Sequence, residues 1–406
     1  MRQIDVAVIG AGQAGLATSY ELSARHIDHV VLERDRIAES WRSRRWDSFA
    51  LNIPNWSFNL PGHRYDGSDP DGFMLRDEIV ERFEAYADAI GAPVEEGVEV
   101  LRLAREPDGR YRLDTTDGEL MVRAVVVATG AYQRRHRPQN SLDPSILQLD
   151  TDTFRNAGEL YDGGVLIVGS GQSGCQIAED LRQDGRSVWL ATGSCGWMPR
   201  RYRGRDNVAW RLEMGVFDES VANLGHAMRL ACPPIQTGVD GGRDLNLRTL
   251  AEAGVTLTGR LLGADGRRVQ LADDLEANAR RSDEAAVRFT TMVDDYVRDR
   301  APDTAAGDPF QPVGELPDAP TEFDLAALGI TNVIWASGFR LDFSWIALDL
   351  DPRDGYPEQV QGVSRHPGLY FMGLQLMHTR KSGLIFGVGE DAAHVASVAA
   401  QHLGAA

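Results

Sequence analysis

The sequence is poor in the residues on which several common classes of protein depend. It contains one lysine, Lys381, and three cysteines, Cys175, Cys195 and Cys232, with no C-x-x-C pair. This spacing predicts neither a disulfide framework nor a zinc site. No apolar run approaches the roughly 18 residues of a membrane span, and the chain enters an apolar strand too early for a signal peptide. We expect a cytoplasmic protein that holds no metal ion.

Acidic residues outnumber basic residues along the chain, 60 to 42. The 406 residues carry a net charge of −18. Because nucleic-acid binding needs a basic face, no nucleic acid is expected as a partner. Since no apolar run could span a membrane, a membrane is not expected either, and a homodimer is left open. The length predicts two or three domains, and a hydrophobic content of 43% is enough for sizeable cores.

Glycine, in contrast, is abundant and occurs twice in the pattern G-x-G-x-x-G. Residues 10–15 follow the apolar run 6–9, and residues 169–174 follow the apolar run 165–168. In such a fingerprint the first glycine allows a tight turn, the second lets a pyrophosphate approach, and the third lets the helix pack on the strand. The two copies predict two dinucleotide sites. Their residues are Gly10, Gly12, Gln13, Ala14 and Gly15, and Gly169, Gly171, Gln172, Ser173 and Gly174.

An acidic residue, Glu33, follows the first fingerprint at the spacing expected of a ribose-binding carboxylate. We expect a helix over residues 16–25 and a buried strand over residues 30–32 that ends at Glu33, 18 residues beyond Gly15. This spacing is typical of an acid that binds a ribose hydroxyl. The alternative is a solvated acid at the end of a strand.

The remaining pattern indicates two α/β units with Rossmann-like sheets. Expected helices cover residues 75–90, 175–184 and 275–297, and expected strands cover 98–103, 111–115, 124–128, 188–190 and 333–336. A connection rich in Pro, Gly and Asp is expected over residues 301–320. The expected division is an FAD domain in two parts, 1–157 and 315–406, with an NAD(P) domain, 158–314, inserted between them.

Two dinucleotide sites in this order predict hydride transfer from a nicotinamide to a flavin. A disulfide reductase needs a redox cysteine pair beside its flavin, and the sequence shows no such pair. Oxygen is therefore the expected acceptor.

At this point the residues resemble a known group, the class B flavoprotein monooxygenase superfamily, in its short YUCCA-like and bacterial CzcO-like branch. The resemblance covers nearly the whole chain. It includes both fingerprints and the segments Glu33-Arg34, Trp41-Arg42, 48–52, 128–130, 198–200, 337–338, 367–373 and 382–389.

The resemblance implies an enzyme that uses FAD, NADPH (with NADH as the alternative) and O2. It would oxygenate a small molecule, preferably at nitrogen or sulfur, through a flavin C4a-hydroperoxide. Asn52 would stabilise that species, unless it is only a turn residue before Pro54. Trp41 would pack near the isoalloxazine, unless it is only a core aromatic. The other implied cofactor contacts are Arg34, Arg42, Val100, Ala128, Thr129, Gly130, Ser337, Gly338, Gly373, Ser382 and Gly383.

The resemblance also implies a helix that starts near Gly383. Its positive end would stabilise the reduced flavin, and Lys381 would add charge there.

Three positions depart from the family pattern. Asp150 stands where many members have a histidine, and Phe154 stands where ketone-oxygenating members have a tryptophan. Thr192 replaces an arginine that grips the 2′-phosphate of NADPH, and Arg200 and Arg201 would supply that charge instead. The alternatives for this arginine cluster are a solvated loop and internal ion pairs.

Two other functions stay open on the sequence alone. One is an NAD(P)H-dependent flavin oxidoreductase or oxidase with another acceptor, which the missing histidine favours. The other is a protein that only holds FAD, although its fingerprints would then be expected to have decayed.

Overall fold

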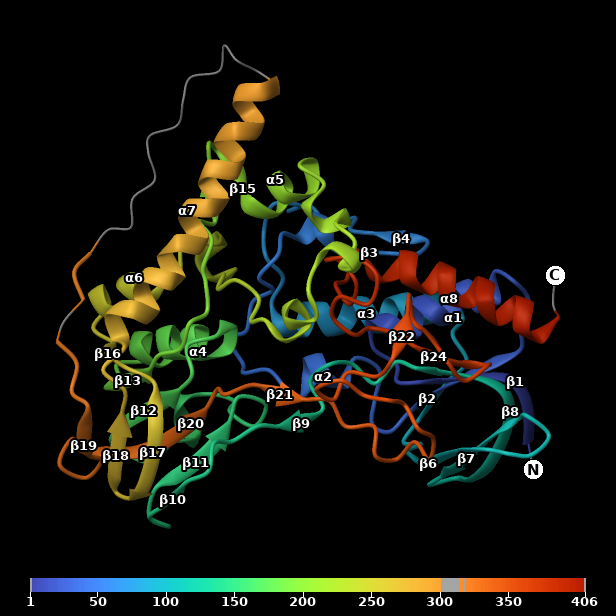
Figure 1. The fold of residues 1–406 in the computed structure, drawn as a ribbon, viewed down its shortest axis with the longest axis horizontal. Helices are drawn as coiled ribbons and strands as arrows, with labels where there is room; N and C mark the ends of the chain where they lie inside the picture. The colour runs from blue at the N-terminus through green and yellow to red at the C-terminus, as the bar shows by residue number, and fades with distance from the viewer. Residues whose placement is uncertain (1, 301–313, 317, 405–406) are drawn as a thin grey trace.

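The computed structural model describes residues 2–300, 314–316 and 318–404 (Figure 1). Its α-helices are α1 (Gln13–Ser23), α2 (Glu39–Arg42), α3 (Arg76–Ala89), α4 (Gln172–Gln183), α5 (Asn207–Glu213), α6 (Leu247–Glu252), α7 (Leu275–Arg300) and α8 (Val388–Leu403). The connection expected over residues 301–320 lies largely outside the described residues.

The first sheet is built around the N-terminal strand, in the order β22-β23-β24-β8-β1-β2-β5, with the hairpin β6–β7 attached to β8. Its strands are β1 (Arg2–Ile9), β2 (His29–Glu33), β5 (Val94–Glu96), β6 (Val100–Arg105), β7 (Tyr111–Thr115), β8 (Gly118–Val127), β22 (Gln359–Val360), β23 (Val363–Ser364) and β24 (Leu369–Phe371). From β24 to β5 all pairs are parallel. Such strands are covered on both faces, and Val6 and Val8 accordingly have no exposed surface.

Two helices far apart in the sequence cover this sheet together. Figure 1 shows α1 and α8 side by side, and both helices contact its strands. The C-terminal residues are thereby brought back to the first fingerprint. We call this sheet and its helices the first unit.

The second unit contains a parallel sheet in the order β11-β20-β12-β13-β16 and an adjoining sheet in the order β10-β17-β18-β19. The strands are β10 (Ser141–Leu142), β11 (Leu147–Asp150), β12 (Gly164–Val168), β13 (Val188–Ala191), β16 (Thr256–Thr258), β17 (Leu261–Gly266), β18 (Arg268–Leu271), β19 (Glu322–Asp324) and β20 (Ile330–Trp335). Apolar side chains of both sheets form one buried cluster. Helix α4 packs on β12 and β13, and α7 extends from this unit (Figure 1).

The strand pairing differs from the expected domain limits at two places. Strand β11 pairs with β20, and β20 pairs with β12, so all three belong to the second unit. Limits at 157/158 and 314/315 would place β11 and β20 in the first unit. The apolar pattern of these strands shows that they are buried but does not show which sheet they join.

The chain passes between the units along two neighbouring segments. Strand β9 (Arg134–Arg135) pairs with β21 (Phe339–Arg340) in this region. Buried side chains of both units belong to one continuous cluster. Two further short pairs join β3 (Asn59–Leu60) to β4 (His63–Arg64) and β14 (Arg201–Tyr202) to β15 (Arg205–Asp206). Within the described residues, no helix has the length and apolarity that crossing a membrane requires.

Candidate functional site

The first fingerprint forms the turn between β1 and α1. Gly10 has a φ of +108°, and a Cβ atom on it would lie 2.7 Å from the carbonyl oxygen of Ala128. A Cβ atom on Gly15 would overlap with the carbonyl oxygen of Gly10. Both positions therefore require glycine. At Gly12, outside the turn itself, no atom of the described residues lies within 4 Å of such a Cβ. The middle glycine leaves room for the approach of a pyrophosphate.

Glu33 ends β2 beside this turn, as expected. Its carboxylate accepts hydrogen bonds from the backbone N–H groups of Ala11 at 2.8 Å and Asp35 at 3.1 Å. The acid is thus held next to the fingerprint, where a ribose would bind. Arg34 is exposed, and its guanidinium donates to Asp35 at 3.1 Å.

The C-terminal segment closes over the start of α1. The Gln13 side chain donates a hydrogen bond to the carbonyl oxygen of Gly383, and a Cβ atom on Gly373 would lie 2.7 Å from the Cβ of Ala14. The buried Ser382 hydroxyl accepts hydrogen bonds from two backbone N–H groups of its own turn. Residues predicted from opposite ends of the sequence therefore meet at one place.

The helix expected to start near Gly383 begins later. Helix α8 starts at Val388, with Gly387 as its N-cap. Gly383 has a φ of +82°, a left-handed conformation that does not fit an α-helix. Turns fill the interval, so the positive end of α8 is displaced along the chain from the predicted position.

Two charged residues, Lys381 and Asp391, lie on either side of the turns between Gly383 and Val388. Lys381 forms ion pairs with Asp218 at 2.5 Å and Glu390 at 2.6 Å. Asp391, in the first turn of α8, is only 4% exposed, and its Oδ2 atom has no hydrogen-bond partner within the described residues. Burial raises the pKa of Asp391 to about 6, against a hydrogen bond with Ser382 that lowers it.

The predicted contacts after β8 border the same turn. The N–H of Ala128 donates to the carbonyl oxygen of Ile9 at 2.9 Å. Gln133 donates to the Thr129 hydroxyl at 3.0 Å and to the Gly130 carbonyl at 2.8 Å. This loop leaves the first sheet and leads to the crossing segment.

Three other residues were predicted to contact the cofactor. Two of them, Trp41 and Arg42, contact other side chains of the protein, and the third, Val100, begins a strand. Trp41 is half-buried, and its ring stacks on Phe83 with centroids 6.3 Å apart, as the core-aromatic alternative expects. Arg42 forms an ion pair with Glu84. Val100 is the half-buried first residue of β6.

The second fingerprint repeats the geometry of the first, with one difference. Gly169 has a φ of +107°, and a Cβ atom on it would lie 2.5 Å from the carbonyl oxygen of Ala336. A Cβ atom on Gly174 would overlap with the carbonyl oxygen of Gly169. At Gly171, however, a Cβ atom would lie 3.2 Å from the sulfur of Cys232. A thiol stands where the first fingerprint is open.

The segment that carries this thiol is tied to α4. The side-chain amide of Gln172 donates to the carbonyl oxygen of Gln236 and accepts from its N–H at 3.0 Å. Ser173 is half-buried in the first turn of α4. A Cβ atom on Gly238 would overlap with the carbonyl oxygen of Leu51, in the first unit. The segment thus connects the second fingerprint with the residue next to Asn52.

Ser337 and Gly338 follow β20 and contact the other crossing segment. The Ser337 hydroxyl donates to the carbonyl oxygen of His136 at 2.5 Å, and the N–H of His136 donates to the carbonyl oxygen of Gly338 at 3.0 Å. These bonds hold the two connections between the units together.

Asn52 is half-buried at the junction of the units. Its backbone carbonyl accepts a hydrogen bond of 2.9 Å from the Arg200 guanidinium. Within the described residues its side-chain amide makes no hydrogen bond, so the amide is available to a ligand.

The arginine cluster is engaged in internal contacts. Arg200 is 2% exposed and forms an ion pair of 2.7 Å with Asp206, and burial lowers the pKa of its guanidinium. Arg201 is exposed and donates to the carbonyl oxygens of Gly241 and Gly242 at 2.9 Å each. This arrangement favours the internal ion-pair alternative for Arg200 and leaves Arg201 as the candidate for phosphate binding.

Thr192 stands at the end of β13 and is buried. Its hydroxyl donates to the carbonyl oxygen of Thr258 at 2.8 Å and accepts from the Asn278 amide at 3.2 Å. Both hydrogen bonds stabilise the second unit, so this side chain is occupied within the fold.

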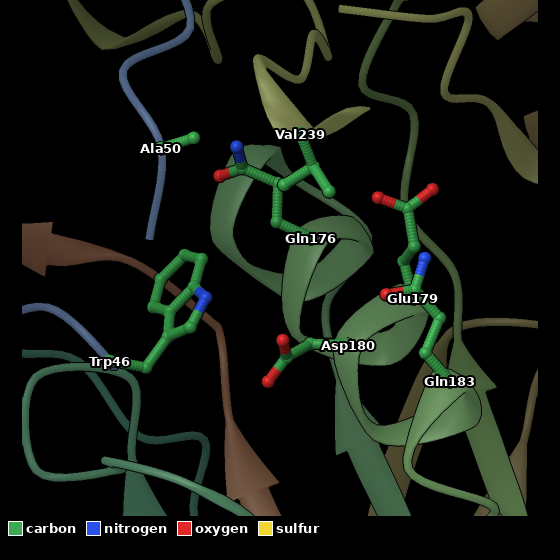
Figure 2. Close-up of a pocket in the computed structure, with 7 residues that line it drawn as sticks. All are labelled: Trp46, Ala50, Gln176, Glu179, Asp180, Gln183 and Val239. Carbon is green, nitrogen blue, oxygen red and sulfur yellow. The ribbon is translucent and has the colours of Figure 1, made fainter. Parts of the chain in front are cut away.

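The two units also meet along α4, as Figure 2 shows. Trp46 and Ala50 of the first unit face α4 and the segment above it. The facing residues are Gln176, Glu179, Asp180 and Gln183 on α4 and Val239 on that segment. The hydroxyl of Ser48 donates to Asp180, and burial raises the pKa of that carboxyl. Glu179 forms an ion pair with Arg243, against the burial that raises its pKa.

The position without the family histidine carries a buried acid that is paired with a partly exposed arginine. Asp150 is 3% exposed and accepts hydrogen bonds from Arg137 at 2.8 and 2.5 Å, and Arg135 pairs with Asp152 at 2.9 Å. Phe154 is fully buried beside them. Arg135 and Arg137 were not predicted from the sequence as partners of these two acids. The signal was visible, because a basic run precedes two aspartates that are two residues apart.

Comparison with known proteins agrees with this arrangement. The family described as "Pyridine nucleotide-disulphide oxidoreductase" matches residues 7–213. The "Uncharacterized oxidoreductase CzcO-like" of Geobacillus kaustophilus (strain HTA426) is 31% identical, over 97% of this chain and 97% of that protein. The "Indole-3-pyruvate monooxygenase YUCCA1" of Oryza sativa subsp. japonica is 33% identical over 44% of this chain and 45% of its own.

A solved structure shows that the fold is shared as well. The flavin-containing monooxygenase from Stenotrophomonas maltophilia superposes with a TM-score of 0.68 at 20% identity, over 99% of this chain and 100% of that one. Since the family match spans both fingerprints and the CzcO-like relative spans nearly the whole chain, the protein belongs to the pyridine nucleotide-disulphide oxidoreductase family, as a CzcO-like member of the class B flavin monooxygenase superfamily.

Proposed function

We propose that the protein is an NAD(P)H- and O2-dependent flavin monooxygenase that transfers one oxygen atom to nitrogen or sulfur of a small molecule. FAD would bind at the first fingerprint and NADPH at the second, with NADH as the alternative. The reaction would take place where the two units meet, beside Asn52. The second unit would be the inserted nicotinamide domain, and it would include β11 and β20, which pair within its sheet.

The residues of the first unit fit a flavin dinucleotide. Gly12 leaves room for the pyrophosphate, and Glu33 is held at the place where a ribose is expected. Gln13 and Gly383 join the fingerprint to the C-terminal turn, where the flavin ring would lie. When bound, FAD would accept a hydride from the nicotinamide, and the reduced flavin would supply the reactivity toward O2.

The contacts between the two units beside Asn52 give the main support for this function. Gln236 is bonded to Gln172 of the second fingerprint, and Gly238 lies against Leu51 of the first unit. The residue after Leu51 is Asn52, whose side-chain amide has no hydrogen-bond partner among the described residues and whose backbone carbonyl accepts from Arg200. An uncharged amide at this junction can both donate and accept, which suits a polar group that must be stabilised without adding charge.

The purified enzyme tests this function. We would measure consumption of NADPH and O2, formation of hydrogen peroxide and formation of oxygenated product with a thioether, a tertiary amine and a 2-oxo acid. The expected result is product that accounts for most of the NADPH with a thioether or an amine. Stoichiometric peroxide and no product with every compound would instead support the oxidase alternative.

A further inference from the structure

Two of the three cysteines meet in the second unit. Cys195 follows β13, and Cys232 lies in the segment that approaches the second fingerprint. Their sulfur atoms donate to the same carbonyl oxygen, that of Pro233, at 3.2 Å from Cys195 and 3.4 Å from Cys232. Because both sulfur atoms lie close to this one oxygen, the two cysteines are neighbours in space. The sequence reasoning expected no cysteine pair, because a spacing motif detects only cysteines that are close along the chain.

The pair lies at the place where a dinucleotide would bind. A Cβ atom on Gly171 would be 3.2 Å from the Cys232 sulfur, whereas at the matching Gly12 the described residues leave this space open. The middle glycine of such a fingerprint is the one that a pyrophosphate approaches. The Cys232 sulfur therefore occupies the approach to the second site.

The two thiols differ in the way that a redox pair requires. Cys232 is exposed to solvent and Cys195 is buried. A donor S–H on the neighbouring Cys195 can stabilise the Cys232 thiolate, which lowers the pKa of Cys232. Cys232 is thus the accessible nucleophile, and Cys195 is the neighbour that can resolve an oxidised sulfur.

We propose that Cys195 and Cys232 form a reversible disulfide that controls the binding of the nicotinamide dinucleotide at the second fingerprint. This inference rests on the proposed function for the assignment of that site. The buried Ile235 anchors this segment, but in the reduced protein no covalent bond holds Cys232 itself, and an arriving nucleotide can displace its side chain. A disulfide would tether the segment to the loop after β13 and keep the sulfur over Gly171.

The oxidant is hydrogen peroxide, which a flavin enzyme that reacts with O2 releases when no substrate is oxygenated. The Cys232 thiolate attacks one peroxide oxygen, the O–O bond breaks, and hydroxide leaves to become water by taking up a proton. The resulting sulfenic acid is attacked by the Cys195 sulfur, the S–O bond breaks, and a second water leaves. Two thiols and one peroxide give one disulfide and two waters. The enzyme would thereby stop consuming NADPH when turnover produces peroxide.

The test uses the flavin-loaded enzyme, reduced with dithiothreitol and then treated with hydrogen peroxide. Peptide mass analysis should show one Cys195–Cys232 disulfide, with Cys175 remaining a free thiol as the internal control. The Kd for NADPH, measured by titration in the absence of O2, should rise about tenfold and return after reduction. In the variant Cys232→Ser, which cannot form the disulfide, the Kd for NADPH should be the same before and after peroxide.

Three results would overturn the proposal, and they are distinguishable. If no disulfide joins Cys195 to Cys232, or if it forms and the Kd for NADPH is unchanged, the redox control is wrong while the proposed function stands. If the reduced enzyme binds neither NADPH nor NADH, the assignment of the second fingerprint fails, and the control fails with it.

Discussion

The guanidinium of Arg200, in the second unit, donates a hydrogen bond of 2.9 Å to the backbone carbonyl of Asn52, in the first unit. The same guanidinium pairs with Asp206 and is 2% exposed. A buried cation therefore joins the units directly beside the proposed reaction site. The bond uses only the backbone of Asn52, so the role of Arg200 can be separated from the role of the Asn52 side chain.

Replacement of Arg200 should act on stability. Arg200→Ala leaves the Asp206 carboxylate without its buried partner, and we expect the free energy of unfolding to fall by about 3–5 kcal/mol. Denaturant unfolding of the purified variant measures this. Arg205→Ala, which removes a surface ion pair with Glu213, should cost no more than about 1 kcal/mol. Equal small losses in both variants would show that the buried pair is not important for the junction.

Replacement of Asn52 should act on chemistry instead. Asn52→Ala keeps the carbonyl that binds Arg200, so the free energy of unfolding should change by less than about 0.5 kcal/mol. If the amide stabilises the oxygenating form of the enzyme, NADPH consumption continues while peroxide rises at the expense of product. The ratio of peroxide to product measures this. An unchanged ratio would leave Asn52 as a turn residue only.

Much of the local structure could be predicted from the sequence. Both strand–turn–helix units follow from an apolar run and glycines such as Gly10 and Gly169, whose φ values other residues rarely adopt. The position of Glu33 follows from counting along one such unit. These features depend on neighbours in the sequence, where periodicity and conformational preference are informative.

What depends on distant contacts could not be predicted. An apolar strand such as β20 does not reveal which sheet it joins, and the spacing of Cys195 and Cys232 gives no sign that they meet. The direction of the Arg200 side chain was equally hidden, because an arginine run looks alike whether it faces solvent or a buried carboxylate. Gly383 matched a helix start only by resemblance, and its left-handed backbone excludes one.

The middle glycine of the first fingerprint should separate flavin binding from folding. Gly12→Ala adds a methyl group into space that the described residues leave open, so the flavin-free protein should unfold as before. The same methyl group would meet the pyrophosphate, and we expect the Kd for FAD to rise about tenfold or more. Gly15→Ala, which overlaps with a backbone carbonyl, should instead reduce stability. Flavin titration and thermal unfolding measure the two effects, and full flavin occupancy in Gly12→Ala would contradict this placement.

Arg201 should decide between the two nicotinamide nucleotides. If its exposed guanidinium turns from the carbonyls of Gly241 and Gly242 to a 2′-phosphate, Arg201→Ala should raise the KM for NADPH about tenfold or more. The KM for NADH should change less than about twofold, since NADH lacks that phosphate. Arg260→Ala, at another exposed arginine of the second unit, is the control. Equal effects on both nucleotides would assign Arg201 a structural role.

Asp391 should make stability depend on pH. Burial raises its pKa in the folded protein from the ordinary 3.8 to about 6, so the folded state binds the proton more tightly than the unfolded state. Stability should therefore fall as the pH rises from about 4 to about 6 and stay lower above that range. Asp391→Asn removes the buried charge, and at pH 7 it should be more stable than the parent by up to about 3 kcal/mol, with little difference near pH 4. Denaturant unfolding across this range measures the effect, with Asp88→Asn on the exposed face of α3 as control. A difference that does not grow between pH 4 and pH 7 would mean that the charge of Asp391 is compensated in the folded enzyme, with His378, whose ring nitrogen lies 4.0 Å from the carboxylate, as the nearest candidate.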